Sequence, residues 1–291
     1  MKKWLNSVTV ALFAILLIGT SCDERGAQKE SDVNRVEIDS SKSTLVNISG
    51  KLFSIPSPIQ TASLIDRDKA PYRIDVLADF EAIDNVPDRN MKAMNLGVFG
   101  IDMVYSSFYE DAQNSLNYYK AVDQLATDLE IKSAIDKNLI NRVGANVDEP
   151  DSLIHLSSKF YESLDAYLKQ NDRTEIAALV LTGAWIESTM LTALSKDEAA
   201  RKALAAQSKA SATLYELISN IELNDKGFKT ELDSLNSSFQ QIEKNYKFIT
   251  PEVFPEQKRT VIKSESSYTL SDSLKNDIQN RLIKLHHIIN G

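Results

Sequence analysis

Two long segments of the sequence have the composition of helices without a polar face. In residues 91–109 the one acid is Asp102, and in residues 175–194 the one charge after the first residue is Glu187. A helix that is hydrophobic all round lies either in the centre of a bundle or in a membrane. An acid at the middle of a membrane span costs about 2.5–3.5 kcal/mol on insertion scales. We therefore expect both segments at the centre of a helical domain.

Glycines inside these two segments indicate how the segments pack. Gly97, Gly100 and Gly183 each lie within an expected helix, where glycine costs about 1 kcal/mol relative to alanine. Such glycines usually allow a second backbone to approach closely. The pattern predicts that the two central helices contact each other.

The two acids should then be buried, and two interpretations of them stay open. In the functional one, Asp102 and Glu187 lie on the wall of a ligand-binding pocket together with Trp185, Tyr105 and Asn95, since acids with perturbed pKa values cluster at sites. In the structural one, each acid belongs to an ion pair or a hydrogen bond in the core, which perturbs acids equally. The structural interpretation is favoured.

The rest of the chain is also typical of helices, because glycine and proline are scarce and strand-like alternation is rare. The predicted fold class is all-α: a single helical bundle of about seven to nine helices, with the two apolar helices in the centre and a C-terminal antiparallel helix pair followed by a last helix. Further helices are expected from Ser57, over residues 72–83, 111–129, 131–143, 150–169, 195–223 and 228–246, and from Ser271 onward, with residues 252–268 irregular or a short strand.

The N-terminus has the parts of a signal peptide. Lys2 and Lys3 precede an apolar run over residues 8–18, and small residues lead to Cys22, the only cysteine in the chain. The stretch "LLIGTSC" resembles the signal peptide of a bacterial lipoprotein, in which a peptidase cuts just before a cysteine that carries diacylglycerol. The resemblance implies that Cys22 is the lipidated first residue. Gly19 departs from the leucine usual at that position, and ordinary secretion with a free thiol is the alternative.

This interpretation divides the chain into three parts. Residues 1–21 are the signal peptide, residues 22–50 are the lipidated N-terminus and a flexible tether rich in Ser, Asp and Lys, and residues 51–291 are the helical domain. Such lipoproteins reside in the cell envelope. The expected location is the outer membrane, on its periplasmic or surface-exposed face, with the lipid as the link to the membrane.

Composition and motifs exclude several classes of function. The net charge is −8, which disfavours nucleic acid as a partner. The three histidines show no metal-binding spacing, so we expect no metal and no cofactor. On helical wheels His155 and His287 face solvent and His286 lies on the flank of its helix. No nucleophile elbow or phosphate-binding loop is present, and an enzyme is the less favoured class.

The stretches "FSIPSPIQTASLI", "MNLGVFGIDMVYSSFY" and "LTGAWIES" resemble uncharacterised all-helical lipoproteins of the Bacteroidota type. That resemblance implies a lipid anchor and a helical domain, and it brings no activity with it. The favoured hypothesis is a membrane-tethered, non-enzymatic binding or scaffold module with an unknown protein or small-molecule partner. The alternative is a hydrolase-like enzyme that uses Asp102 and Glu187 as its two carboxyl groups.

Overall fold

The structure is a computed structural model, and it describes most of the chain between residues 43 and 291. The described residues are 43–48, 51–56, 70–86, 88–134, 171–248, 252–254, 259–261 and 264–291, with scattered positions between 142 and 170. The chain divides into two units, Met1–Glu37 and Ile38–Gly291, and all described residues belong to the second. The signal peptide, Cys22 and the helix expected from Ser57 lie outside the described residues.

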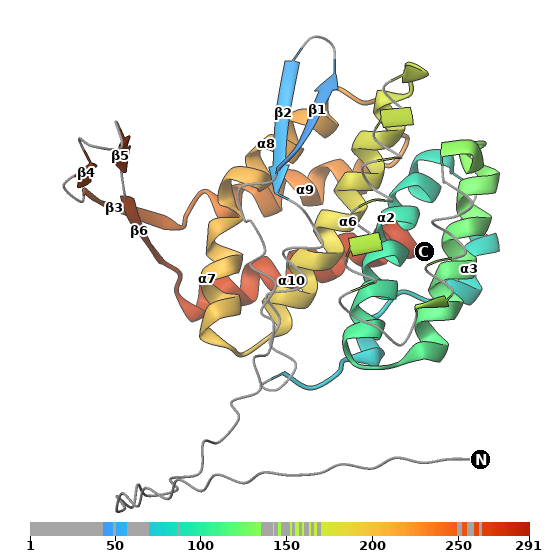
Figure 1. The fold of residues 1–291 in the computed structure, drawn as a ribbon, viewed down its shortest axis with the longest axis horizontal. Helices are drawn as coiled ribbons and strands as arrows, with labels where there is room; N and C mark the ends of the chain where they lie inside the picture. The colour runs from blue at the N-terminus through green and yellow to red at the C-terminus, as the bar shows by residue number, and fades with distance from the viewer. Residues whose placement is uncertain are drawn as a thin grey trace, which may run out of the picture. The chain divides into compact units, whose positions relative to one another are not determined.

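The domain is an all-α bundle, as predicted (Figure 1). The described positions between 152 and 170 are helical too. Residues 72–83, expected to be one helix, instead form two short 3-10 helices. The α-helices with defined bounds are α2 (Arg89–Phe108), α3 (Ala112–Asp128), α6 (Thr174–Leu194), α7 (Glu198–Ala206), α8 (Ser208–Ser219), α9 (Lys226–Phe239) and α10 (Asp272–Asn290), and the 3-10 helices are η1 (Ile74–Val76), η2 (Phe80–Asn85) and η3 (Lys132–Ala134).

The two apolar helices, α2 and α6, pack together at the centre of the domain, which confirms the prediction. Gly97 and Gly183 lie at the contact. A Cβ atom on Gly97 would lie 2.0 Å from the carbonyl oxygen of Val180, and one on Gly183 would lie 2.0 Å from that of Met94. Glycine therefore allows backbone-to-backbone contact between the two helices. The side chain of Asp88 caps the start of α2 by accepting from two backbone N–H groups.

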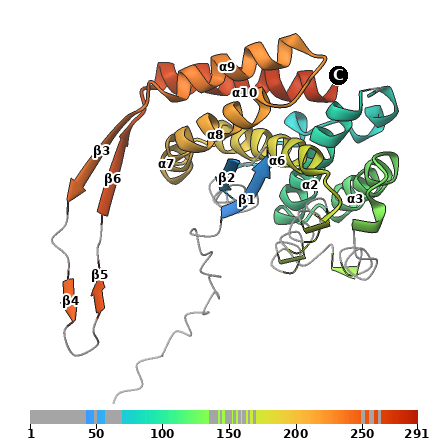
Figure 2. The ribbon, with the colours of Figure 1, turned by 90° about the horizontal axis from the view of Figure 1, so that it is seen from above.

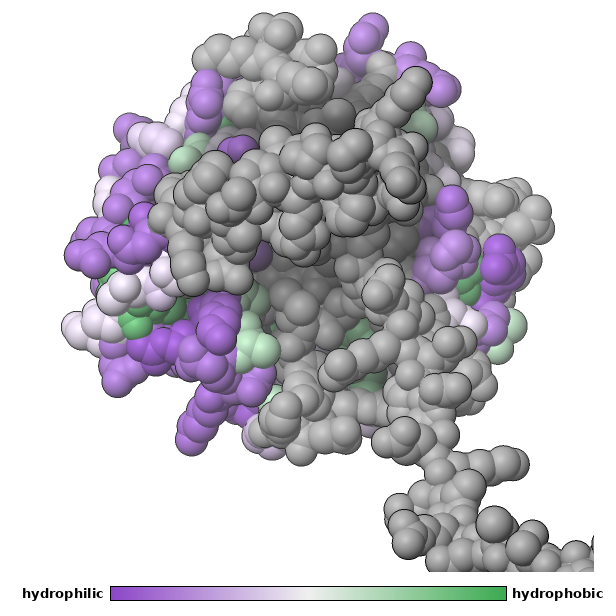
Figure 3. All heavy atoms as spheres, turned by 60° about the vertical axis from the view of Figure 1, so that its left-hand side comes forward, coloured by the Kyte–Doolittle hydropathy of each residue, from purple (hydrophilic) through white to green (hydrophobic). Residues whose placement is uncertain are grey.

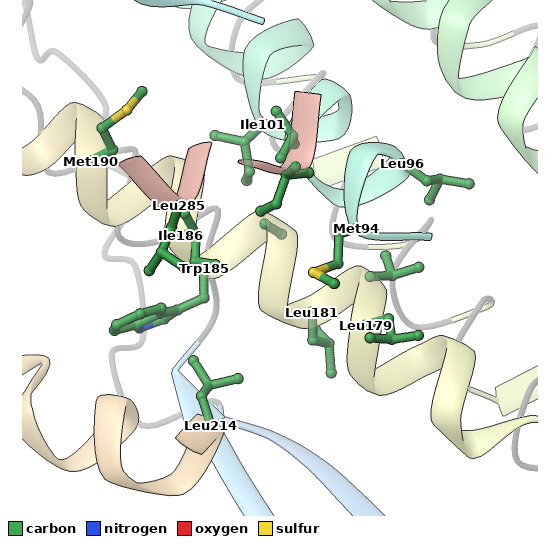
Figure 4. Packing of buried hydrophobic residues seen from close by; sticks show 14 of the residues in the cluster. Met94, Leu96, Ile101, Leu179, Leu181, Trp185, Ile186, Met190, Leu214 and Leu285 are labelled. Atoms are coloured by element: carbon green, nitrogen blue, oxygen red, sulfur yellow. The ribbon is translucent and has the colours of Figure 1, made fainter. Parts of the chain in front are cut away.

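Helices α7, α8 and α10 pack against α6, and α9 packs against α8 and α10. Figure 4 shows Trp185 of α6 on the side that faces Leu214 of α8. The predicted apolar stripe of α10 is buried at Ile278, Leu282, Leu285 and Ile289. Residues far apart in the sequence thus share one hydrophobic core with α6.

Two predicted helix boundaries are wrong. Residues 195–223 form α7 and α8 rather than one helix, and the N-cap is Asp197, not Ser195. The break lies at Gln207, whose backbone stays close to helical geometry (φ −74°, ψ −6°), so no glycine or proline marks it. Helix α9 ends at Phe239 instead of continuing to residue 246, because the residues after the turn at 240–242 pair with a distant strand.

Within the described residues, six short strands form three antiparallel pairs. Strand β1, Ser43–Ile48, pairs with β2, Lys51–Pro56, and so falls in the last part of the expected tether. Strand β3, Glu243–Phe248, pairs with β6, Ser264–Thr269, and β4, Glu252–Phe254, pairs with β5, Arg259–Val261. Figure 2 shows the β3–β6 ribbon leaving the helices at the ends of α9 and α10.

Helix α6 is long and apolar enough to cross a membrane by length and composition, and it is the one such helix among the described residues. Of the 18-residue apolar segment of α6 that meets this criterion, 94% is buried inside the domain. The described surface is hydrophilic over most of the face in Figure 3, with hydrophobic residues in small separate areas. Of the described large hydrophobic side chains, Ile74 is the exposed one, at 55%.

Candidate functional site

Asp102 of α2 and Glu187 of α6 lie together in the core, and His286 of α10 joins them. Both acids have no exposed surface, and His286 is 5% exposed. Glu187 Oε2 and His286 Nδ1 are 2.5 Å apart. We call these three residues the buried cluster. The structure therefore brings together the two acids that the sequence singled out, Asp102 on α2 and Glu187 on α6.

The two carboxyl groups influence each other, since the charge of Glu187 raises the pKa of Asp102. Asp102 Oδ1 and Glu187 Oε1 are buried and have no hydrogen-bond partner within the described part of the chain. A buried carboxylate oxygen without a donor is costly, so the protonated form of each acid is favoured.

Burial explains the protonation of all three groups. Burial raises the pKa of Asp102 well above its ordinary value, and the charge of Glu187 raises it further. Burial also raises the pKa of Glu187, to about 8. Burial lowers the pKa of His286, which favours the neutral imidazole. At neutral pH the cluster therefore retains carboxyl protons that the same acids would lose in water.

His286 is the residue that the sequence analysis placed on the flank of its helix and assigned no role. It lies four residues after Leu282 and three before Ile289 on α10, and both of those are buried. These spacings place His286 on the buried face of the helix. His155 and His287 are exposed, as predicted.

A segment before α2 closes the cluster from one side. We call residues 70–86 the strap. The backbone N–H of Ala78 donates to Asp102 Oδ2 at 3.1 Å, and the Ala78 carbonyl accepts from Tyr118 Oη of α3 at 2.8 Å. The strap is also hydrogen-bonded to α2, because the backbone N–H of Arg73 donates to Tyr105 Oη at 3.3 Å. One buried carboxyl thus anchors the middle of the strap.

Trp185 and Asn95 do not join the acids in a pocket. Trp185 Nε1 donates to Gln207 Oε1 at 2.9 Å. Asn95 Nδ2 donates to the carbonyls of Met91 and Ile289, at 3.1 and 2.7 Å. Both residues tie helices to one another inside the core, which matches the structural interpretation of polar core residues.

Tyr105 is the one candidate residue that lines a described pocket. The pocket has a volume of about 200 Å³ and lies between the start of the strap and the C-terminal end of α6. Its cations are Arg73 and Lys196, and Ser195 lies beside them. Arg73 is bound to Asp75 at 2.8 Å, whereas Lys196 is exposed and has no carboxylate partner among the described residues. The apolar part of the wall comes from Leu191 and Leu194.

Chemically, the cluster and the pocket are different kinds of site. The cluster can store protons but lines neither of the described pockets. The pocket offers positive charge, hydroxyl groups and a small apolar wall. Within the described residues, no group of three or more His, Cys, Asp or Glu side chains is arranged to hold a metal ion. No known protein family, curated protein or solved structure matches the chain.

Proposed function

We propose that the protein is a lipid-anchored, non-enzymatic binding module of the bacterial cell envelope, held at the outer membrane through Cys22. The observation that carries the binding role is the pocket beside Tyr105, where two cations meet a small apolar wall. The lipoprotein-like N-terminus supports the anchor.

The pocket favours a small organic carboxylate as its ligand. Lys196 supplies a positive charge that no described carboxylate neutralises, and a carboxylate is its natural partner. Leu191 and Leu194 suit a short apolar or aromatic body. A volume of about 200 Å³ lies below the range of roughly 300–1,000 Å³ for sites of drug-sized ligands. A ligand of the size of benzoate fits these limits.

The alternative, a hydrolase-like enzyme using Asp102 and Glu187, has less support. General acid catalysis needs a carboxyl group within hydrogen-bond reach of the scissile bond. Both acids are fully buried and bonded to neighbours, and neither lines a described pocket. A substrate would have to displace the strap to reach them.

Binding is tested with benzoate as the probe and benzamide as its neutral match. Benzoate should bind and benzamide should not, as measured by calorimetry at low salt. Lys196→Gln should weaken benzoate binding about tenfold, because a hydrogen bond to a charged group contributes about 1.5–3 kcal/mol before screening. Lys202→Gln, at an exposed lysine of α7 outside the pocket, is the matched control and should bind normally. Equal binding of both probes, or none of either, would refute the carboxylate site.

The anchor is tested separately. Cys22→Ala should abolish labelling by a fatty-acid analogue and move the protein from the membrane to the soluble fraction, because lipid chains supply the membrane affinity. Cys22→Ser, which keeps a polar side chain of similar size, should behave the same way. Membrane association of the wild type without any lipid label would argue against the lipoprotein proposal.

A further inference from the structure

The strap connects the pocket to the buried cluster. Its first residues, with Arg73, form one wall of the pocket. Five residues further on, Ala78 donates to Asp102 of the cluster. One continuous piece of chain therefore forms part of the pocket wall and bonds to Asp102.

The contacts of the strap fall into two kinds. Near the pocket they are hydrogen bonds of tyrosine hydroxyls: Tyr109 Oη, at the C-terminal end of α2, donates to the Ala70 carbonyl at 2.9 Å, and Tyr72 Oη donates to Oδ2 of Asp111, the N-cap of α3, at 3.1 Å. In the middle of the strap Ala78 is buried and bonds to Asp102. If this middle part lifts, Asp102 loses its backbone donor and its cover.

We propose that the Asp102–Glu187 carboxyl pair is a proton-dependent latch that holds the strap, and with it the pocket wall, in the closed position. The latch regulates the binding pocket and in that respect rests on the proposed function. With the strap closed, the pair is fully buried, one oxygen of each acid has no hydrogen-bond donor among the described residues, and the acids keep their protons. With the strap lifted, water reaches the acids, and they ionise as they do in solution.

Proton linkage fixes the direction of the effect. The closed strap keeps carboxyl protons up to a pKa of about 8 for Glu187, whereas carboxyls in water lose them near pH 4. The closed form thus binds more protons than the open form between these values. Its advantage is fully present at low pH and is lost as the pH rises, about tenfold in the open–closed equilibrium per pH unit for each retained proton.

Other titratable groups around the pair leave a usable pH window. His286 is held neutral by burial, so opening lets it gain a proton only below its ordinary value of about 6.5. That effect opposes the carboxyls and is confined to lower pH. Burial raises the pKa of Tyr118, which contacts the strap from α3, so it stays protonated. Asp79, beside Ala78, is exposed. Between pH 6.5 and 8 the carboxyl pair governs the strap.

Amide hydrogen exchange of the full chain tests the latch directly. The Ala78 N–H reports strap opening, and the N–H of Leu181 in α6 reports unfolding of the core. After correction for intrinsic exchange, the protection of Ala78 should fall at least tenfold per pH unit between pH 6.5 and 7.5. Leu181 should stay better protected than Ala78 throughout. The double variant Asp102→Asn, Glu187→Gln, which has no carboxyl to titrate, should show pH-independent protection of Ala78.

Tyr118→Phe is the matched control, because it removes a bond to the strap without touching a carboxyl. It should lower the protection of Ala78 at every pH and keep the tenfold slope. A pH-independent Ala78 amide in the wild type would overturn the latch, even if the double variant does not fold. Equal protection of Ala78 and Leu181 would overturn it too, because opening would then be global unfolding.

Benzoate separates the latch from the binding function. If both proposals hold, saturating benzoate raises the protection of Ala78, because the ligand binds the closed wall. If the pH slope is present but benzoate has no effect and does not bind, the latch stands and the carboxylate site fails. If benzoate binds while Ala78 shows no pH slope, the site stands and the latch fails.

Discussion

Gly97→Ala and Gly183→Ala should each lower the free energy of unfolding by about 3 kcal/mol or more, the upper range for overpacking a core. In each case the new methyl group would lie 2.0 Å from a backbone carbonyl oxygen of the facing helix. A side chain can rotate away from such a clash, but a helix backbone cannot. Relief therefore requires α2 and α6 to separate along their contact, which weakens the packing of the whole core.

Gly227→Ala is the matched control for these two variants. Gly227 is exposed in the first turn of α9, and a Cβ there meets only the side-chain oxygen of Asp225, at 3.0 Å. The change should be neutral or stabilise by up to about 1 kcal/mol, the helix preference for alanine. Urea unfolding of all three variants measures the difference. A loss below about 1 kcal/mol at Gly97 and Gly183 would contradict the close contact of the central helices.

The central helix pair could be predicted because its cause is local. A long helix without a polar face lies either in a protein core or in a membrane. The glycines within these two segments indicated a close contact between them. The break between α7 and α8 could not be predicted, because Gln207 keeps nearly helical backbone angles and no breaker residue stands there. The end of α9 depends on pairing with residues 264–269, which local periodicity does not reveal.

The candidate site could likewise be predicted from the sequence only in part. Burial of Asp102 and Glu187 followed from their apolar neighbours in the sequence. Their partner did not, because His286 lies 99 residues beyond Glu187 and belongs to a helix with an otherwise ordinary amphipathic pattern. The bond from Ala78 is made by a backbone N–H, which every residue except proline carries. Only the fold shows which backbone group reaches the acid.

Glu187→Ala should destabilise the domain by about 3–5 kcal/mol, the range for removing one member of a buried polar pair or truncating a large core side chain. The change leaves a cavity between α2, α6 and α10. It also leaves His286 Nδ1 without its partner at 2.5 Å. His286 is not exposed enough to turn to water for a replacement.

Glu187→Gln is the isosteric control, and the two variants together test how the pair is protonated. The amide of glutamine has the shape of the acid, and its N–H₂ and carbonyl can still bond to Asp102 and His286. If Glu187 is protonated at pH 7, this variant should lose only about 1 kcal/mol, the scale of one altered hydrogen bond. A loss as large as that of Glu187→Ala would mean that His286 is charged and depends on the negative charge of Glu187. The cluster would then be an ion pair rather than a store of protons.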